Sequence, residues 1–546
     1  MLILESKSIK KYYGHRLILD IDDLKVYSND RIGLVGRNGI GKTTLLDILS
    51  QRIKADEGWI KIHGKYEYVS QLGQPNKKYL SEEMASKFRT KALWDDTMSG
   101  GEKTRFKLAQ ALSDDSLMLF ADEPTSNLDI EGIELLEEIL SQYDGAFIII
   151  SHDRDFLDKL CNKIIELEDG KIKTYNGNYS KYKEQKELEK ERAYFEYKQY
   201  VDEKGRLERA IIETSQKNAS IKGPPKRMGI SEARLHKMGG QKAKATLDRK
   251  VKNIKKRIEQ LEKKEKPFEY KEVKFDILES SKLHSKIVIE GKHINKSFGQ
   301  KTIFKDGDFT IYNGKKVALI GPNGCGKSTL LKMIVNGDKA IKTAKAAKIG
   351  YFSQDLSILN DNLTILENVM ETSAYPEEFC RLLLGRLLFR GDSVHKKVGI
   401  LSGGERVKVS FAKIILQDIN LLILDEPTNY LDIDSLEAVE STLKDYHNTI
   451  LLVSHDRRFI SSIADTIMTI DNHKIHIFNG NYQEFLNKNK KKDQKQNIRE
   501  EIILLETKLS GIIGCLSMET DEEIKERLDR EYFEILSKIK AYKEML

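Results

Sequence analysis

The chain has 546 residues, a formal net charge of +7 and a charged fraction of 32%. At roughly 100–200 residues per domain, this length predicts roughly three or four structural units instead of one core. It holds no apolar run of the ~20 residues that a membrane-spanning helix needs, and its first residues include an acid and lysines where a secretory signal stays apolar. We therefore expect a soluble, cytoplasmic protein without a membrane partner. Its four cysteines lack metal-site spacing and are expected to be reduced thiols.

Two segments match the phosphate-binding pattern G-x-x-x-x-G-K-[ST], GRNGIGKTT at residues 36–44 and GPNGCGKST at residues 321–329. Each follows an apolar run that predicts a buried strand and precedes a predicted helix. In such a loop the glycines let backbone N–H groups surround phosphates, the lysine adds positive charge, and the next hydroxyl holds Mg²⁺. One match alone also fits a glycine turn before a surface helix, but two in matching order exclude that reading. The predicted ATP contacts in these loops are Gly36, Asn38, Gly39, Gly41, Lys42, Thr43, Thr44, Gly321, Asn323, Gly324, Gly326, Lys327, Ser328 and Thr329.

Further motifs follow both loops in the same order, which indicates a duplicated unit. They are, in order, YEYVSQ and IGYFSQ, MSGGE and LSGGE, FADEPTSNLD and ILDEPTNYLD, and IIISHD and LLVSHD. This set resembles the ATP-binding cassette (ABC) ATPases across nearly all of both halves of the chain.

The chemistry of phosphoryl transfer to water assigns roles to these motifs, because it requires a neutralised γ-phosphate, a bridging metal and an oriented water. Carboxylates at the ends of apolar strands are suited to hold Mg²⁺ through water, and the glutamates that follow them would polarise the attacking water. The histidines could sense the γ-phosphate, and the glutamines could touch metal and water. The predicted catalytic residues are Glu123, Glu426, His152 and His455. The predicted metal contacts are Thr43, Gln71, Asp122, Ser328, Gln354 and Asp425.

The SGGE segments precede helices, whose N-terminal N–H groups favour an anion. In cassette ATPases this segment caps nucleotide held by the opposite half, so the resemblance implies two composite sites, in which Lys42 faces residues 402–405 and Lys327 faces residues 99–102. The contacts it implies are Ser99, Gly100, Gly101, Glu102, Ser402, Gly403, Gly404 and Glu405. Two aromatic residues are expected to stack on the base, with a place in the core as the alternative: Tyr13 and Phe298.

Between the halves, residues 183 to about 285 form a charged, helix-forming segment with breaks expected at residues 223–225 and at Gly239 and Gly240. It predicts two long helices and a tip. Residues 217–257 hold fourteen Lys or Arg against two acids, a net charge of +12. This charge suits the phosphates of a nucleic acid, and the absence of aromatic residues favours structured RNA over stacked single strands. A charged coiled coil that serves solubility is the alternative.

The tail from Ile498 on has apolar residues at helical spacing and predicts a helical hairpin that turns near residues 517–521. Contact with a partner and packing only against itself are the two alternatives for this hairpin. We therefore expect an α/β fold with two tandem ABC-type P-loop ATPase domains joined by a long α-helical hairpin linker and followed by a C-terminal helical extension. The expected boundaries are 1–182 for ATPase domain 1, 183–284 for the linker, 285–488 for ATPase domain 2 and 489–546 for the extension.

A tandem cassette ATPase with such a linker resembles the ABC-F family of ribosome-associated translation factors. The phrases GNYSKYKEQKELEKER and LSGGERVKVS are similar to its Vga-type antibiotic-resistance branch, as is the compact first half, in which 28 residues separate Gln71 from Ser99 against 48 from Gln354 to Ser402. The resemblance implies a monomer that pairs its two ATPase domains and binds the E site of the bacterial 70S ribosome, near 23S rRNA and P-site tRNA. Its linker would displace lincosamide, pleuromutilin or streptogramin A drugs from the peptidyl-transferase centre, and ATP hydrolysis would release it.

Two other functions stay open at this point. The first is a housekeeping ABC-F translation factor that rescues stalled ribosomes. The second is a DNA-handling or transporter-associated cassette ATPase, which the absence of zinc-type cysteine pairs and of a membrane element disfavours.

Overall fold

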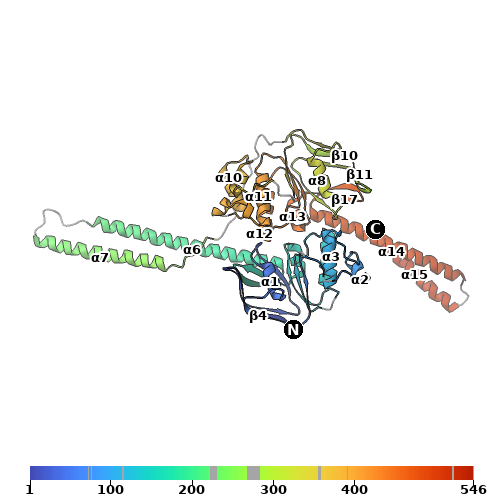
Figure 1. The fold of residues 1–546 in the computed structure, drawn as a ribbon, viewed down its shortest axis with the longest axis horizontal. Coiled ribbons are helices and arrows are strands. Elements are labelled where there is room, and N and C mark those ends of the chain that lie inside the picture. The colour runs from blue at the N-terminus through green and yellow to red at the C-terminus, as the bar shows by residue number, and fades with distance from the viewer. Residues whose placement is uncertain are drawn as a thin grey trace. The chain divides into compact units, whose positions relative to one another are not determined.

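The computed structural model describes residues 1–71, 73–75, 77–113, 116–221, 230–266, 283–353, 358–389, 391–518 and 522–544. Its internal contacts divide the chain into two compact units. One unit comprises Met1–Leu160, Ile165–Lys173 and Val273–Leu546, and the other comprises Cys161–Ile164 and Thr174–Glu272. The first unit contains two α/β halves and a C-terminal helical hairpin, and the second contains a long helical hairpin (Figure 1).

The N-terminal half, residues 2–176, consists of two sheets and the helices that cover them. Its strands are β1 (Leu2–Tyr13), β2 (Arg16–Tyr27), β3 (Arg31–Val35), β4 (Glu57–Ile62), β5 (Tyr66–Val69), β6 (Met118–Asp122), β7 (Ala146–Ile150), β8 (Lys163–Glu168) and β9 (Lys171–Asn176). Its helices are α1 (Lys42–Leu49), α2 (Glu82–Lys87), α3 (Gly100–Ala111), α4 (Ile130–Ser141) and α5 (Arg154–Leu160). One sheet has the strand order β2-β1-β4 and the other the order β5-β6-β7-β3-β8-β9.

The C-terminal half, residues 287–479, repeats this topology. Its strands are β10 (Ile287–Phe298), β11 (Lys301–Tyr312), β12 (Lys316–Ile320), β13 (Ile341–Thr343), β14 (Ile349–Phe352), β15 (Leu421–Asp425), β16 (Thr449–Val453), β17 (Thr466–Asp471) and β18 (Lys474–Asn479). Its helices are α8 (Lys327–Val335), α9 (Ile365–Met370), α10 (Glu377–Arg386), α11 (Gly403–Ile415), α12 (Ile433–Lys444) and α13 (Arg457–Ile463). The sheets have the orders β11-β10-β13 and β14-β15-β16-β12-β17-β18.

The central strands of both large sheets are mostly apolar because both of their faces are covered, one of them partly by the strands of the small sheet. Every residue of β6, β7, β15 and β16 is buried. These strands are parallel, and Asp122 pairs with Ile150 while Asp425 pairs with Val453. The carboxyl ends of neighbouring strands therefore meet at one edge of each sheet, which brings together the motifs that end these strands.

The two halves differ between the glutamine loop and the SGGE helix. In the C-terminal half, α9, α10 and two short 3₁₀ helices (Gly391–His395 and Val398–Ile400) occupy this interval. In the described residues of the N-terminal half, α2 is the one helix there. This difference agrees with the shorter spacing in the sequence.

The second unit is a hairpin of two long helices, α6 (Tyr179–Ser220) and α7 (Ile230–Gln260). The 42 residues of α6 correspond to about 63 Å of helix at ~1.5 Å per residue. Leu207 on α6 is 6% exposed, and the side chain of Asn218 donates to Asp248 of α7 at 2.6 Å. The hairpin linker expected from the sequence is confirmed.

The expected helix break at Gly239 and Gly240 is wrong, since α7 runs through both residues. A glycine inside a helix costs about 1 kcal/mol relative to alanine. A helix with good helix formers on both sides of the pair tolerates that cost. The sequence analysis therefore gave the two glycines too much weight as helix breakers. The break expected at residues 223–225 lies outside the described residues.

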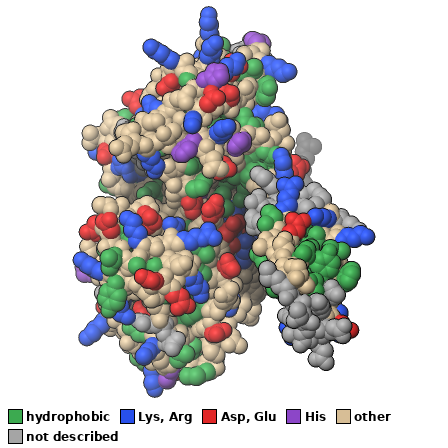
Figure 2. All heavy atoms as spheres, turned by 90° about the vertical axis from the view of Figure 1, so that its right-hand side faces the viewer, with side chains coloured by type: hydrophobic (Ala, Val, Ile, Leu, Met, Phe, Trp, Pro, Cys, Tyr) green, Lys and Arg blue, Asp and Glu red, His purple; other side chains and the backbone are tan. Residues whose placement is uncertain are grey.

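The C-terminal hairpin consists of α14 (Tyr482–Met518) and α15 (Glu522–Glu544) and confirms the expected helical extension. Its interior contains Ile502, Ile512, Ile535 and Ile539, each less than 10% exposed. Hydrophobic side chains also gather on its outside, at the right of the face in Figure 2. The exposed large hydrophobic residues in the described parts of α14 and α15 are Ile503, Leu504, Ile513, Phe533 and Leu536. In the described part of the chain, no helix combines the length and apolar composition needed to span a bilayer.

The hairpin offers a test of its packing at two adjacent positions. Ile535 is 7% exposed and Leu536 is 42% exposed. Ile535→Ala removes buried methylene groups and is expected to destabilise the hairpin locally by about 2 kcal/mol or more, whereas Leu536→Ala is expected to cost less than about 0.5 kcal/mol. Amide hydrogen exchange in α14 and α15 measures both changes. Equal exchange in the two variants would contradict this packing.

Candidate functional site

Both predicted phosphate loops have a backbone that only glycine accommodates. Gly41 and Gly326 cap α1 and α8 with φ values of 112° and 110°. A Cβ atom at Gly41 would lie 2.9 Å from Ile18 Cγ2, and one at Gly326 would lie 2.4 Å from Ile303 Cγ2. Each loop thus ends at a helix N-terminus, where an anion is favoured.

The loop lysines curl back onto their own loops. The Lys42 ammonium donates to the carbonyl oxygens of Gly36 at 2.7 Å and Arg37 at 3.0 Å. Lys327 donates to the carbonyl oxygens of Gly321 at 2.8 Å and Pro322 at 3.1 Å. Burial lowers the pKa of Lys42, although nearby carboxylates oppose this effect. A phosphate would supply the negative charge that a buried ammonium needs.

The hydroxyl after each lysine contacts the carboxylate at the end of the neighbouring strand. Thr43 donates to Asp122 at 2.9 Å, and Ser328 donates to Asp425 at 3.2 Å. Burial raises the pKa of both aspartates. A hydroxyl and a carboxylate oxygen this close together are a donor set that suits Mg²⁺.

The predicted catalytic glutamates and histidines lie side by side in both halves. The Nε2 atom of His152 is 3.2 Å from Glu123 Oε1, and that of His455 is 3.3 Å from Glu426 Oε1. Burial raises the pKa of Glu123 to about 8 and that of Glu426 to about 7. It lowers the pKa of His152 to about 3 and that of His455 to about 4. Both histidines are therefore neutral near pH 7.

The Nδ1 atoms of His152 and His455 are buried and have no hydrogen-bond partner among the described residues. Buried polar atoms are nearly always satisfied in folded proteins. The arrangement therefore fits a site in which a further polar group, such as a water or a phosphate oxygen, forms a hydrogen bond with the Nδ1 atom of each histidine.

A cavity of about 1040 Å³ is lined by residues of both halves. Lys327, Ser328, Asp425 and Phe298 are not among its lining residues, so it brings the predicted residues around Lys42 together with only part of those around Lys327. The predicted residues in its lining are Tyr13, Asn38, Gly39, Gly41, Lys42, Thr43, Thr44, Gln71, Ser99, Gly100, Gly101, Asp122, Glu123, His152, Asn323, Gly324, Ser402, Gly403, Gly404, Glu426 and His455. Lys42 thus shares a cavity with residues 402–404 of the opposite half. Gln354 lies outside the described residues.

The glutamates of the SGGE segments serve the helices that they start. Ser99 accepts from the backbone N–H of Glu102, and the Glu102 carboxylate accepts from the Ser99 N–H at 2.9 Å and hydroxyl at 2.8 Å. Ser402 and Glu405 form the same capping box. These mutual bonds direct the glutamates toward the helix start.

The two aromatic residues predicted to stack on a base are exposed. Tyr13 is 54% exposed and Phe298 is 58% exposed, which excludes the alternative of a core position. Lys11 lies 6.0 Å from the ring centre of Tyr13, and Lys296 lies 5.9 Å from that of Phe298. Both rings therefore lie outside the core.

Two aspartates join the halves, and the sequence reasoning did not single them out. The backbone N–H of Asn38 donates to Asp432 at 2.9 Å, and that of Asn323 donates to Asp129 at 2.9 Å. Asp129 and Asp432 are the last residues of the FADEPTSNLD and ILDEPTNYLD motifs. An aspartate directly before a helix is an N-cap signal that could have indicated α4 and α12 but not the bond of each aspartate to the opposite half.

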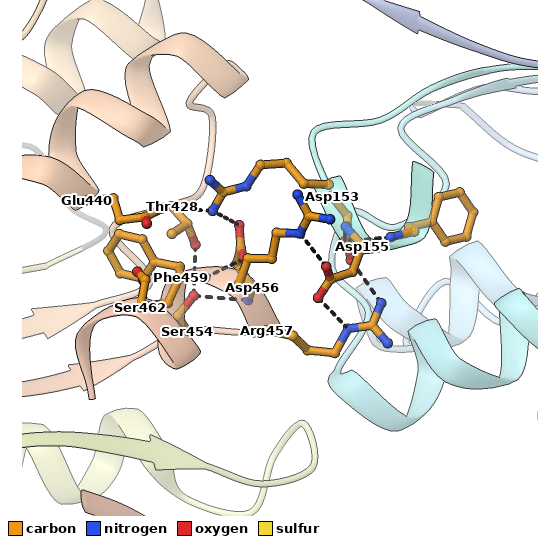
Figure 3. Close-up of polar contacts among 12 residues, drawn as sticks. Asp153, Asp155, Thr428, Glu440, Ser454, Asp456, Arg457, Phe459 and Ser462 are labelled. Atoms are coloured by element: carbon orange, nitrogen blue, oxygen red, sulfur yellow. Dashed lines mark hydrogen bonds and ion pairs between the residues drawn. The ribbon is translucent and has the colours of Figure 1, made fainter. Parts of the chain in front are cut away.

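A second set of residues that the sequence reasoning missed follows the histidines. Arg154 and Arg457 begin α5 and α13, and both are buried. Arg154 is bonded to Glu440 of the opposite half, and Arg457 is bonded to Glu137 of the opposite half. Figure 3 shows the surroundings of Glu440, Asp456 and Arg457. The repeated HDR triplet was the one signal for them in the sequence.

The buried glutamates predict how stability depends on pH in the nucleotide-free protein. A glutamate ionises near pH 4.5 when unfolded, whereas the pKa of Glu123 is raised to about 8 and that of Glu426 to about 7 in the fold. The folded state thus binds more protons between these values, so its stability falls as pH rises through this window. Replacing both by Gln removes the titration. The double variant is expected to gain melting temperature over wild type increasingly from pH 5 to about pH 8.

Thermal unfolding without nucleotide or Mg²⁺, at several pH values, measures this difference. Two exposed glutamates, Glu138 and Glu378, provide the matched control when both are replaced by Gln. A gain of the same size at all pH values would contradict the burial of the two site glutamates.

Comparisons with known proteins agree with this geometry. The profile of the family described as "ABC transporter" matches residues 19–94 and 304–429. The chain is 35% identical to the erythromycin resistance ATP-binding protein MsrA of Staphylococcus epidermidis, over 84% of the chain and 95% of that protein. It is 34% identical to the ribosome protection protein VmlR of Bacillus subtilis, over 94% of each.

Among solved structures, a complex of an archaeal ribosomal stalk protein with the archaeal ribosome recycling factor aABCE1 is similar, with a TM-score of 0.58. It is 19% identical and covers 88% of this chain and 91% of that one, which supports the tandem fold. Since the family profile matches both halves and MsrA matches nearly its whole length, the chain belongs to the ABC-F family of ATPases and is an ATP-binding and ATP-hydrolysing enzyme.

Proposed function

We propose that each site hydrolyses ATP with a glutamate and a histidine of the same half. Glu123 or Glu426 accepts a proton from the attacking water at its carboxylate, and His152 or His455 orients the γ-phosphate. These roles are supported by the close approach of each histidine Nε2 atom to a glutamate Oε1 atom. They are also supported by the buried Nδ1 atom of each histidine, which has no hydrogen-bond partner among the described residues. Bound nucleotide brings the negative charge that Lys42 and Lys327 neutralise.

Mg²⁺ would be held by Thr43, Asp122 and Gln71 in one site and by Ser328, Asp425 and Gln354 in the other. When bound, the metal would neutralise negative charge on the phosphates. The contact of each hydroxyl with its aspartate supports this assignment. Ser99, Gly100 and Gly101, or Ser402, Gly403 and Gly404, would cap the nucleotide from the opposite half, and Tyr13 or Phe298 would stack on its base.

We further propose that the protein is a cytoplasmic, ATP-dependent ribosome-protection factor. In its ATP-bound form it binds the E site of the bacterial 70S ribosome, close to 23S rRNA and P-site tRNA. Its hairpin linker then displaces lincosamide, pleuromutilin or streptogramin A drugs, as in the Vga-type branch, and ATP hydrolysis releases it. The names of MsrA and VmlR, which denote drug resistance and ribosome protection, support this direction.

The basic surface of α7 is the observation that carries the ribosomal part of the proposal. Lys244, Arg249, Lys250 and Lys252 are exposed, whereas Leu247 between them is partly buried. One face of α7 thus packs and the other presents cations. Nucleic-acid phosphates bind such a surface with strong dependence on salt.

The first test traps the ATP-bound form. Glu123→Gln with Glu426→Gln is expected to stop hydrolysis and to keep the protein on 70S ribosomes in the presence of ATP, since release requires hydrolysis. Sucrose-gradient sedimentation measures this binding. The same variant with Lys42→Ala and Lys327→Ala is the control, because it cannot hold nucleotide. A trapped variant that sediments free of ribosomes with ATP present would overturn the proposal.

The second test reverses charge on α7. Lys244→Glu, Arg249→Glu and Lys250→Glu together are expected to weaken ribosome binding and to lower the salt slope by roughly 0.7–0.9 per lost phosphate contact. The matched control reverses three exposed cations on α6, Lys190, Arg192 and Lys198. Equal loss in both triple variants would contradict a role for the α7 surface.

Drug susceptibility of cells that express the wild type or the α7 variant separates drug resistance from a housekeeping role. Expressed in a susceptible bacterium, the wild type is expected to raise the inhibitory concentration of at least one of the three drug classes, and the α7 variant to lose this effect. Ribosome binding with unchanged inhibitory concentrations would favour a translation factor that rescues stalled ribosomes.

A further inference from the structure

The arginine that follows each site histidine reaches into the opposite half. Arg154 is 6% exposed, and its Nη2 atom lies 2.9 Å from Glu440 Oε2 on α12. Arg457 is 5% exposed and donates through Nη1, at 3.2 Å, and Nη2 to the two oxygens of Glu137 on α4. A guanidinium that bonds both oxygens of a carboxylate fixes orientation as well as distance.

The same arginines also approach the histidine loop of the opposite half. Arg457 Nη2 lies 3.7 Å from Asp153 Oδ2, and Arg154 Nη2 lies 3.8 Å from Asp456 Oδ2 (Figure 3). Asp153 directly follows His152, and Asp456 directly follows His455. The two histidine loops are therefore joined through buried charges.

Helix α4 connects this contact to the phosphate loop of the same site. At its N-cap, Asp129 accepts the backbone N–H of Asn323, which lies four residues before Lys327. Eight residues later, about 12 Å along the helix, Glu137 accepts from Arg457, which lies two residues after His455. One rigid helix of the N-terminal half thus touches both the phosphate loop and the histidine loop of the other half.

Helix α12 does the same for the other site. Asp432 at its N-cap accepts from Asn38, and Glu440 accepts from Arg154. The arrangement is reciprocal, so neither histidine loop is positioned by its own half alone.

We propose that Arg154 and Arg457 are positioning residues for ATP hydrolysis, each of which places the neighbouring histidine only when the opposite half is docked. Docking of α4 or α12 then sets the phosphate loop and the histidine of one site together. Because each arginine also approaches the other histidine loop, a change at one site is transmitted to the other. A buried ion pair is by itself weak evidence for stability, so the value of these pairs lies in the orientation they fix.

Site-resolved ATPase kinetics without ribosomes test this inference independently of the ribosomal proposal. In a Glu123→Gln background, only the site of His455 hydrolyses. There Arg457→Met is expected to lower kcat on the order of ten- to a hundredfold, with KM changed by less than about threefold. In a Glu426→Gln background, where only the site of His152 hydrolyses, Arg457→Met should have the smaller effect and Arg154→Met the larger one.

A double variant separates positioning from simple neutralisation of a buried glutamate. Arg457→Met with Glu137→Met removes both charges of the pair, and Lys159, which also bonds Glu137, is exposed enough for water to replace that bond. The double variant is therefore expected to regain melting temperature but not kcat. Recovery of kcat as well would overturn the proposal, since Arg457 would then only neutralise Glu137. Arg457→Lys, which keeps the charge without the fork, is expected to recover only part of kcat.

Two further variants complete the experiment. Arg458 also bonds across the halves, to Asp155 and, at 3.6 Å, to Asp158, and Arg458→Met should keep kcat within about twofold at both sites. His455→Ala tests the role of the histidine in hydrolysis separately from the positioning role of Arg457. If it lowers kcat and Arg457→Met does not, the positioning role is wrong. If neither lowers kcat, the role of the histidine and the positioning role fall together.

Discussion

The structure depends on one carboxylate in each half that makes two different bonds. Asp129 Oδ1 accepts from Gly132 and caps α4, while its Oδ2 accepts from Asn323 in the opposite phosphate loop. Burial alone would raise the pKa of Asp129, but the N–H donors of Asn323 and Gly132 outweigh it and lower that pKa. The carboxylate therefore stays charged at neutral pH. The Asp129 carboxylate both caps α4 and docks the two halves, so a substitution of this residue changes both.

The backbone around the two glutamates proposed to be catalytic is strained in the same way in both halves. Glu123 and Glu426 have φ values of 49° and 52°, in the left-handed region that disfavours side chains. Such a residue costs on the order of 1–3 kcal/mol and persists where the surroundings fix it. Here the N–H of Glu123 donates to Ile150 at 2.9 Å, and that of Glu426 donates to Val453 at 3.0 Å. The neighbouring strand thus sets the position from which each glutamate faces its histidine.

The fold followed from the sequence because its signals are local and repeated. Apolar runs before and after each phosphate loop predicted the strands and helices, and the ordered motifs predicted that both halves have the same topology. The contacts between halves could not be predicted in this way. Arg154 and Glu440 are 286 residues apart, and Arg457 and Glu137 are 320 apart, so only the docking of the finished halves brings them together. The glycine pair in α7 misled because helix propensity is a weak preference that a long helix overrides.

The pairing of Asp155 with Arg458 has a consequence for the history of the chain. Residues 154 and 457 occupy equivalent places in the two halves, so Asp155 and Arg458 are equivalent as well, yet they bond to each other. Equivalent residues that meet must lie at the axis that relates the halves. Two copies of the N-terminal half would place aspartate against aspartate there, and two copies of the C-terminal half would place arginine against arginine. Divergence at this single position therefore favours pairing of an N-terminal half with a C-terminal half over pairing of two like halves.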